Sequence, residues 1–171
     1  MRNEFGNADV WTLLSFVPDD KKQEVSDYID AISKDERYMF DADHTFVGFM
    51  GDYINYADIL VQMAKIQMIG NPFLKKRGPP LIVYDVGCST ALQHIVFDPM
   101  IHYVGIDYGQ PEPMFFRENC SYVEGKFSEV LEKLNINPYT SVGIANMSLL
   151  YGLDDSELKV FDKVFRRKFV R

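Results

Sequence analysis

Residues 81–91, with the sequence Leu-Ile-Val-Tyr-Asp-Val-Gly-Cys-Ser-Thr-Ala, decide the fold. The first six are mostly apolar and rich in β-branched side chains, and Gly87 ends the run. This pattern is typical of a strand buried on both faces of a parallel sheet. Further apolar runs lie at 102–106, 121–123 and 141–145, and helical patterns lie at 128–134 and 154–166. The alternation predicts an α/β fold with a mostly parallel sheet and helices on both faces.

The preceding part of the chain has a different pattern of apolar residues, with helical spacing. An acidic start at residues 18–20 precedes apolar residues at helical spacing, and a second helical pattern over 53–66 ends near Gly70, with Pro72 beyond it as a stop signal. The run 10–17 fits a strand or a helix equally well. A basic, Gly- and Pro-rich connector at 75–80 marks the boundary. We therefore expect an N-terminal helical segment over 1–78 and a second domain over 79–171.

Composition excludes several classes of protein. The 171 residues carry a formal net charge of −7, which disfavours a nucleic-acid partner. Only two cysteines, Cys88 and Cys120, are present. We therefore expect no disulfide scaffold, and we expect the protein in a reducing compartment. No apolar run is long enough to cross a membrane, which predicts a cytoplasmic protein. The three histidines show no metal-ligand spacing, so no metal site is expected, and His94 is expected on the surface of a helix.

Acidic and small residues gather where the predicted strands end. Asp85, Gly87 and Cys88 close the first strand, and Asp107 closes the second, 22 residues beyond Asp85. In open parallel sheets, ligands bind beyond the carboxyl ends of the strands. An acid at the end of the second strand can accept hydrogen bonds from both hydroxyls of a ribose.

An ordered series of motifs resembles the class I, Rossmann-like, S-adenosylmethionine-dependent methyltransferases. The stretch VYDVGCSTA resembles their first motif, D-x-G-x-G-x-G, and YVGIDYG is similar to the second strand, whose terminal acid binds the ribose. YVEGKFSEVL resembles the third strand, and VGIANMSLLYGLDDSELKVFDKVFRR the fourth strand with its helix. The resemblance covers about the last ninety residues.

The resemblance implies S-adenosylmethionine as cofactor, but it identifies no catalytic residue. It implies a set of cofactor-binding residues at the strand ends, namely Asp85, Gly87, Cys88, Ser89, Asp107, Tyr108, Phe127 and Asn146. Ser89 and Ala91 stand where the family has glycines, and Lys126 replaces an acid expected beside the adenine. The sequence ends after the fourth-strand helix, where the family continues with a fifth strand.

Structural alternatives accompany these assignments. Asp85 can fix the turn that follows it, Cys88 can be a buried filler, and Tyr108 can simply pack. At the level of function, one hypothesis is a methyltransferase acting on a small molecule or protein, and another is an inactive module that binds the cofactor or a protein partner. A nicotinamide-dependent oxidoreductase fits less well, because G-x-G-x-x-G is missing. A short sheet also predicts that the N-terminal segment, a second copy or a partner covers it.

Overall fold

The computed structural model describes residues 14–32, 50–70, 81–88, 91–107, 118–137, 140–145 and 154–165. The chain divides into two compact units, Met1–Ala57 and Asp58–Arg171. The domain boundary expected after residue 78 stays a prediction, since residues 71–80 lie outside the described ranges.

The N-terminal part is helical, as its apolar spacing predicts. A 3-10 turn, η1 (Asp19–Lys21), leads into α2 (Lys22–Ile32), and α3 spans Met50–Gly70. Exposed ion pairs three residues apart, such as the one from Lys21 to Glu24 at 2.8 Å, lie on the first turns. Helical spacing accounts for which side chains are buried: Val25 and Ile29 on α2, and Tyr53, Ala57, Leu60 and Ala64 on α3.

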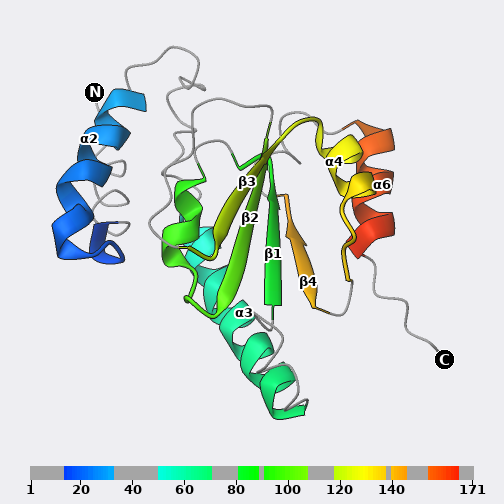
Figure 1. Ribbon diagram of the computed structural model, residues 1–171, viewed down its shortest axis with the longest axis horizontal. Helices are drawn as coiled ribbons and strands as arrows, with labels where there is room; N and C mark the ends of the chain where they lie inside the picture. The colour runs from blue at the N-terminus through cyan, green and yellow to red at the C-terminus, as the bar shows by residue number, and fades with distance from the viewer. Residues whose placement is uncertain are drawn as a thin grey trace. The chain divides into compact units, whose positions relative to one another are not determined.

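Four parallel strands form the sheet (Figure 1). They are β1 (Leu81–Val86), β2 (Ile101–Asp107), β3 (Cys120–Glu124) and β4 (Ser141–Ile144), in the order β3-β2-β1-β4. The central β1 is paired with β2 and β4 and is almost entirely buried, which explains its continuous apolar sequence. The predicted α/β class and parallel sheet are confirmed, and the architecture is a Rossmann-like α/β fold.

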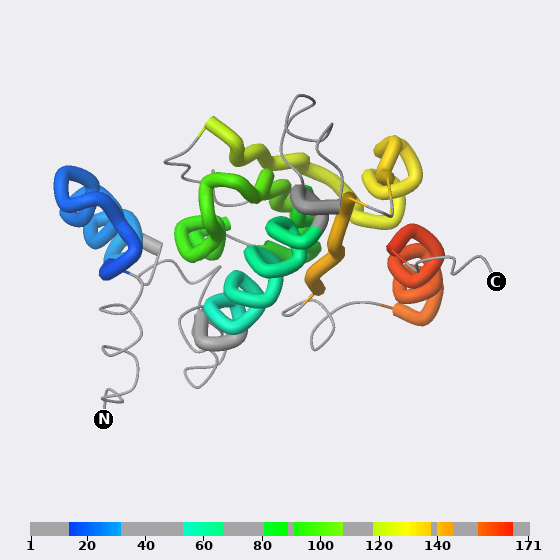
Figure 2. The backbone as a smooth tube through the Cα atoms, turned by 90° about the horizontal axis from the view of Figure 1, so that it is seen from below, coloured from blue at the N-terminus to red at the C-terminus, as the bar shows by residue number. Residues whose placement is uncertain are grey.

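One face of the sheet packs against two helices, α4 (Phe127–Lys133) and α6 (Asp155–Phe165). They lie together on one side of the strands in Figure 2. Tyr84 and Val86 of β1 meet apolar residues of both helices in this core. Helix α6 approaches β4 closely at Gly143, where an added Cβ would stand 2.5 Å from the ring of Phe165.

The opposite face packs against a short 3-10 helix, η4 (Leu92–Val96), whose five residues are all buried. The expectation that His94 lies on the surface is wrong, because its side chain has no exposed area. His94 Nδ1 lies 2.7 Å from the carbonyl oxygen of Ala91, and its ring lies 6.1 Å from that of Tyr103 on β2. In η4, the polar side chains are therefore buried together with the apolar ones.

Candidate functional site

The strand order creates one place where the chain reverses direction across the sheet. From β1 the chain continues to β2 and β3 on one side, and β4 then returns to the other side of β1. In open α/β sheets, ligands bind outside the carboxyl ends of the strands at such a switch point. The switch point lies between β1 and β4, and the candidate site is the carboxyl edge beside it, where the residues that follow β1 and end β2 are described.

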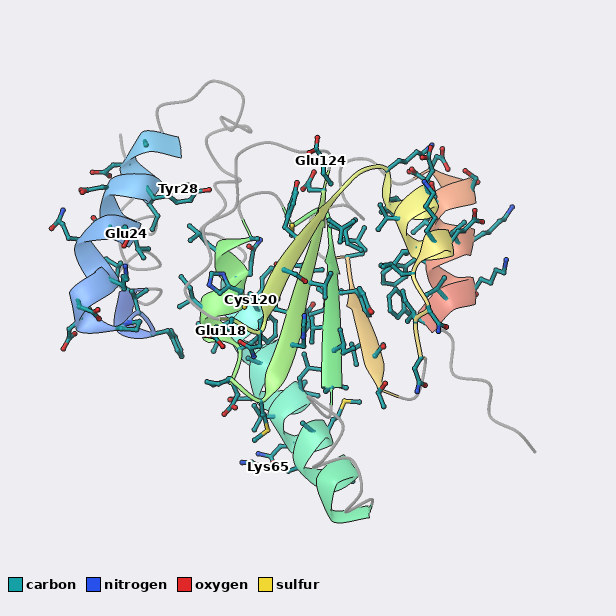
Figure 3. All side chains as sticks on the ribbon, in the orientation of Figure 1. Glu24, Tyr28, Lys65, Glu118, Cys120 and Glu124 are labelled. Carbon is teal, nitrogen blue, oxygen red and sulfur yellow. The ribbon has the colours of Figure 1, made fainter. Side chains whose placement is uncertain are left out.

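Asp107 lies at this edge as the last residue of β2, where the sequence predicts it. Its side chain is partly exposed, and its backbone oxygen accepts a hydrogen bond of 2.8 Å from the N–H of Gly125. It is in register with Glu124, the last residue of β3. Figure 3 shows Glu124 at this edge and Cys120 and Glu118 at the opposite end of β3. Two carboxylates thus end neighbouring strands at the rim.

The turn after β1 closes against β2. Gly87 has a φ of 73°, a value that glycine adopts without strain, and its N–H donates to the oxygen of Ile106 at 2.8 Å. Ala91 stands where the methyltransferase motif has a glycine, and it is buried in a left-handed conformation with φ 55°. For a residue with a Cβ this conformation costs about 1–2 kcal/mol. The backbone here keeps a shape suited to glycine.

Cys88 fills a space left by a glycine on the next strand. A Cβ added to Gly105 would stand 2.7 Å from the Cys88 sulfur, so the thiol packs directly over the β2 backbone. Burial raises the pKa of the Cys88 thiol well above its usual value, and the charges of Asp85 and Asp107 raise it further. The thiol is therefore protonated at neutral pH, which suits packing and not nucleophilic attack.

Asp85 lies in the interior beneath the turn. It has no exposed area, and its Oδ2 accepts a hydrogen bond of 2.6 Å from the Tyr103 hydroxyl. Tyr103 is itself fully buried, between the rings of His94 and Phe97. The protein thus covers Asp85, whose charge acts on the site through space.

Two carbonyl groups of the turn, those of Cys88 and Ala91, each receive two donors. Cys88 O accepts from Gln93 Nε2 and from the N–H of Ala91, both at 3.0 Å. Ala91 O accepts from the His94 backbone N–H at 3.1 Å and lies 2.7 Å from His94 Nδ1, which must carry the proton because a carbonyl only accepts. These contacts use both lone pairs of each oxygen, and the side chains of η4 thereby hold the turn in place.

Two predicted positions near the start of α4 have structural partners. Phe127 is 5% exposed and belongs to the apolar core between the sheet and the helices. Lys126, which stands where the methyltransferase motif has an acid, places its Nζ 3.5 Å from Oε1 of the buried Glu157 on α6. Lys126 therefore joins two helices.

The structure brings together Asp85, Gly87, Cys88 and Asp107 from the predicted set. The other members, Ser89, Tyr108 and Asn146, lie outside the described residues. Sequence reasoning missed the polar residues that support the turn, Gln93 and Tyr103. A signal exists for the second of these, because Tyr103, Gly105 and Asp107 alternate along β2 and so share one face.

No group of three or more His, Cys, Asp and Glu side chains within the described ranges is arranged to hold a metal ion. No helix in those ranges combines the length and apolar character needed to cross a bilayer. Comparisons with protein-family models, with curated proteins and with solved structures give no match to this chain.

Proposed function

We propose that this protein binds S-adenosylmethionine at the carboxyl edge of β1 and β2 and transfers its methyl group to a small-molecule or protein acceptor. The position of Asp107 carries the proposal. Asp107 is partly exposed and ends β2 beside the switch point. The neighbouring strand, β1, ends in the tight turn at Gly87. A carboxylate so placed suits the two hydroxyls of a ribose.

The charge at the edge favours a cationic ligand. Burial is the main reason that the pKa of Cys88 is raised, and the charges of Asp85 and Asp107 raise it further, so both carboxylates make the potential at the turn more negative. A sulfonium ion gains from such a potential, whereas a pyrophosphate is repelled. The N–H groups of Gly87, Ala91 and His94 are already bonded to protein oxygens. This argues against the nicotinamide-dependent alternative, which needs free backbone donors for phosphate.

Methyl transfer requires little acid–base catalysis from the protein. The cofactor supplies a methyl group on a positively charged sulfur. A lone pair of the acceptor forms the new bond to carbon while the carbon–sulfur bond breaks, and its electron pair remains on sulfur. The chain's contribution is to hold the two reactants in line. A base is required only if the acceptor must lose a proton early.

A second candidate function, cofactor binding without turnover, has its own support. Ala91 stands at a position where the motif has a glycine, and the Cys88 thiol fills space in the same turn. A turn filled by side chains can bind the nucleoside and still misplace the methyl group by the small distance that ends catalysis. This candidate predicts binding of the cofactor with no methyl transfer to any acceptor.

Calorimetry on the full chain tests binding. We expect S-adenosylmethionine and S-adenosylhomocysteine to bind more tightly than NAD. Asp107→Ala should weaken both by about tenfold or more, the loss expected for hydrogen bonds to a charged group. Glu118→Ala is the matched control, since Glu118 is an exposed acid at the other end of β3.

Tighter binding of NAD, or an affinity unchanged by Asp107→Ala, would contradict the proposal. Transfer of a labelled methyl group to candidate acceptors then separates the two functions. Labelled product supports the enzyme, whereas binding without product across small-molecule and protein acceptors supports the module.

A further inference from the structure

Gln93 carries a buried acceptor that nothing in the described part of the chain satisfies. The residue is 2% exposed, and its Oε1 has no hydrogen-bond partner. Its Nε2 donates to Cys88 O at 3.0 Å, and this fixes the orientation of the amide, since a carbonyl oxygen can only accept. Nearly all buried polar groups in folded proteins are paired, so such an exception indicates a ligand or an internal water.

Three other acceptors at the turn are already in use. Cys88 O and Ala91 O each receive two donors, and Asp85 Oδ2 receives the Tyr103 hydroxyl. Gln93 Oε1 is therefore an acceptor that a hydrogen-bond donor arriving at this turn can use. Because Gln93 Nε2 donates to Cys88 O, the Gln93 amide lies beside the turn at the end of β1.

We propose that Gln93 Oε1 accepts a hydrogen bond from the α-ammonium group of a bound S-adenosyl amino acid and so sets specificity for the amino-acid part of the ligand. The inference rests on the proposed function. Two carboxylates, Asp85 and Asp107, act on the turn. Among the ligand's donors, the ribose hydroxyls suit Asp107, and the ammonium gains more than the neutral adenine amine from the negative potential.

A ligand pair that differs in one group tests the assignment. S-adenosylhomocysteine is compared with 5′-S-(3-carboxypropyl)-5′-thioadenosine, which lacks only the α-amino group. We expect wild type to prefer the amino compound by about tenfold or more, and Gln93→Met, of similar shape without an acceptor, to lose most of that preference. His94→Leu is the control. It removes a neighbouring support of the turn and should weaken both ligands alike, with the preference retained.

Equal affinities in wild type would overturn the assignment and leave an internal water as the partner of Gln93. A preference that survives Gln93→Met, or that His94→Leu also abolishes, would overturn it too. If Gln93→Met does not fold, Gln93→Glu decides, because it keeps the acceptor: a retained preference supports the proposal and a lost one contradicts it. Failure of wild type to bind either compound would instead refute the proposed function.

Discussion

The contact between Cys88 and Gly105 shows how single residues shape the candidate site. The thiol packs against the backbone of Gly105, and a Cβ added at that position would stand 2.7 Å from the sulfur. Gly105→Ala forces these atoms apart in a buried location and should destabilise the protein by about 1–3 kcal/mol. Urea unfolding followed by circular dichroism measures this change.

The double variant Gly105→Ala/Cys88→Ala isolates the contact. Removing the sulfur makes room for the new methyl group, so the double variant should be more stable than the sum of the two single changes predicts. Strict additivity would show that the cost of Gly105→Ala arises elsewhere, for example from the Ala91 methyl group 3.4 Å away.

The site was predictable where its signals are local. Gly87 and Asp107 stand at the ends of apolar runs, and a strand end can be read from a few neighbouring residues. The pairing of Tyr103 with Asp85 depends on the register between two strands, which no local pattern fixes. The role of Gln93 depends on a fold of the backbone that brings its amide back to Cys88.

At the scale of elements, α6 begins with a reciprocal cap that also anchors the helix. Asp154 Oδ1 accepts from the N–H groups of Ser156 and Glu157 at 2.8 and 2.9 Å, and Glu157 Oε2 lies 3.3 Å from the N–H of Asp154. This is a capping box, in which each side chain satisfies an end of the helix backbone. Glu157 is buried and is the residue that Lys126 reaches from α4.

The cap predicts a graded response at Glu157. Glu157→Ala removes the acceptor and should cost about 1–2 kcal/mol of unfolding free energy. Glu157→Gln keeps a capping oxygen and loses only the charge opposite the exposed Lys126, so it should cost less than about 1 kcal/mol. Chemical denaturation provides the comparison, with Glu132→Ala on the exposed side of α4 as a control near wild type. Equal costs for Ala and Gln would assign the stability to the ion pair.

Most elements follow from sequence periodicity, and the exception has a physical reason. The run 102–106 extends by one residue at each end in β2, because Ile101 pairs with Leu81 of β1 and Asp107 pairs with Glu124 of β3. The 3-10 helix η4 differs, since His94 is expected from the sequence on an exposed helix surface and Gln93, beside it, is also polar. Both are buried, because their side chains bond back to the turn that precedes them. Hydropathy does not reveal polar groups that are satisfied internally.

At the scale of the whole molecule, the buried Cys88 and the half-buried His102 set opposite pH limits on stability. Burial raises the pKa of Cys88, helped by Asp85 and Asp107, and burial lowers the pKa of His102. The folded state therefore holds the thiol proton after the unfolded chain has lost it, above a pH of about 8.5. It likewise resists protonation of His102 when the pH falls below about 6.5. Both groups favour folding between these values.

The alkaline limit gives a testable pH dependence. Above a pH of about 8.5 the unfolded state binds fewer protons than the native state, so the free energy of unfolding should fall as the pH rises. Cys88→Ala lowers stability at neutral pH by creating a small cavity, but it removes this titration, so its stability should fall less steeply with pH. Urea midpoints measured from pH 7 to 9.5 test the slope, with Cys120→Ala as the control for loss of a thiol as such. An equal decline in wild type and Cys88→Ala would mean that another group drives it, and that burial of Cys88 beside Asp85 and Asp107 raises its pKa too little to affect stability.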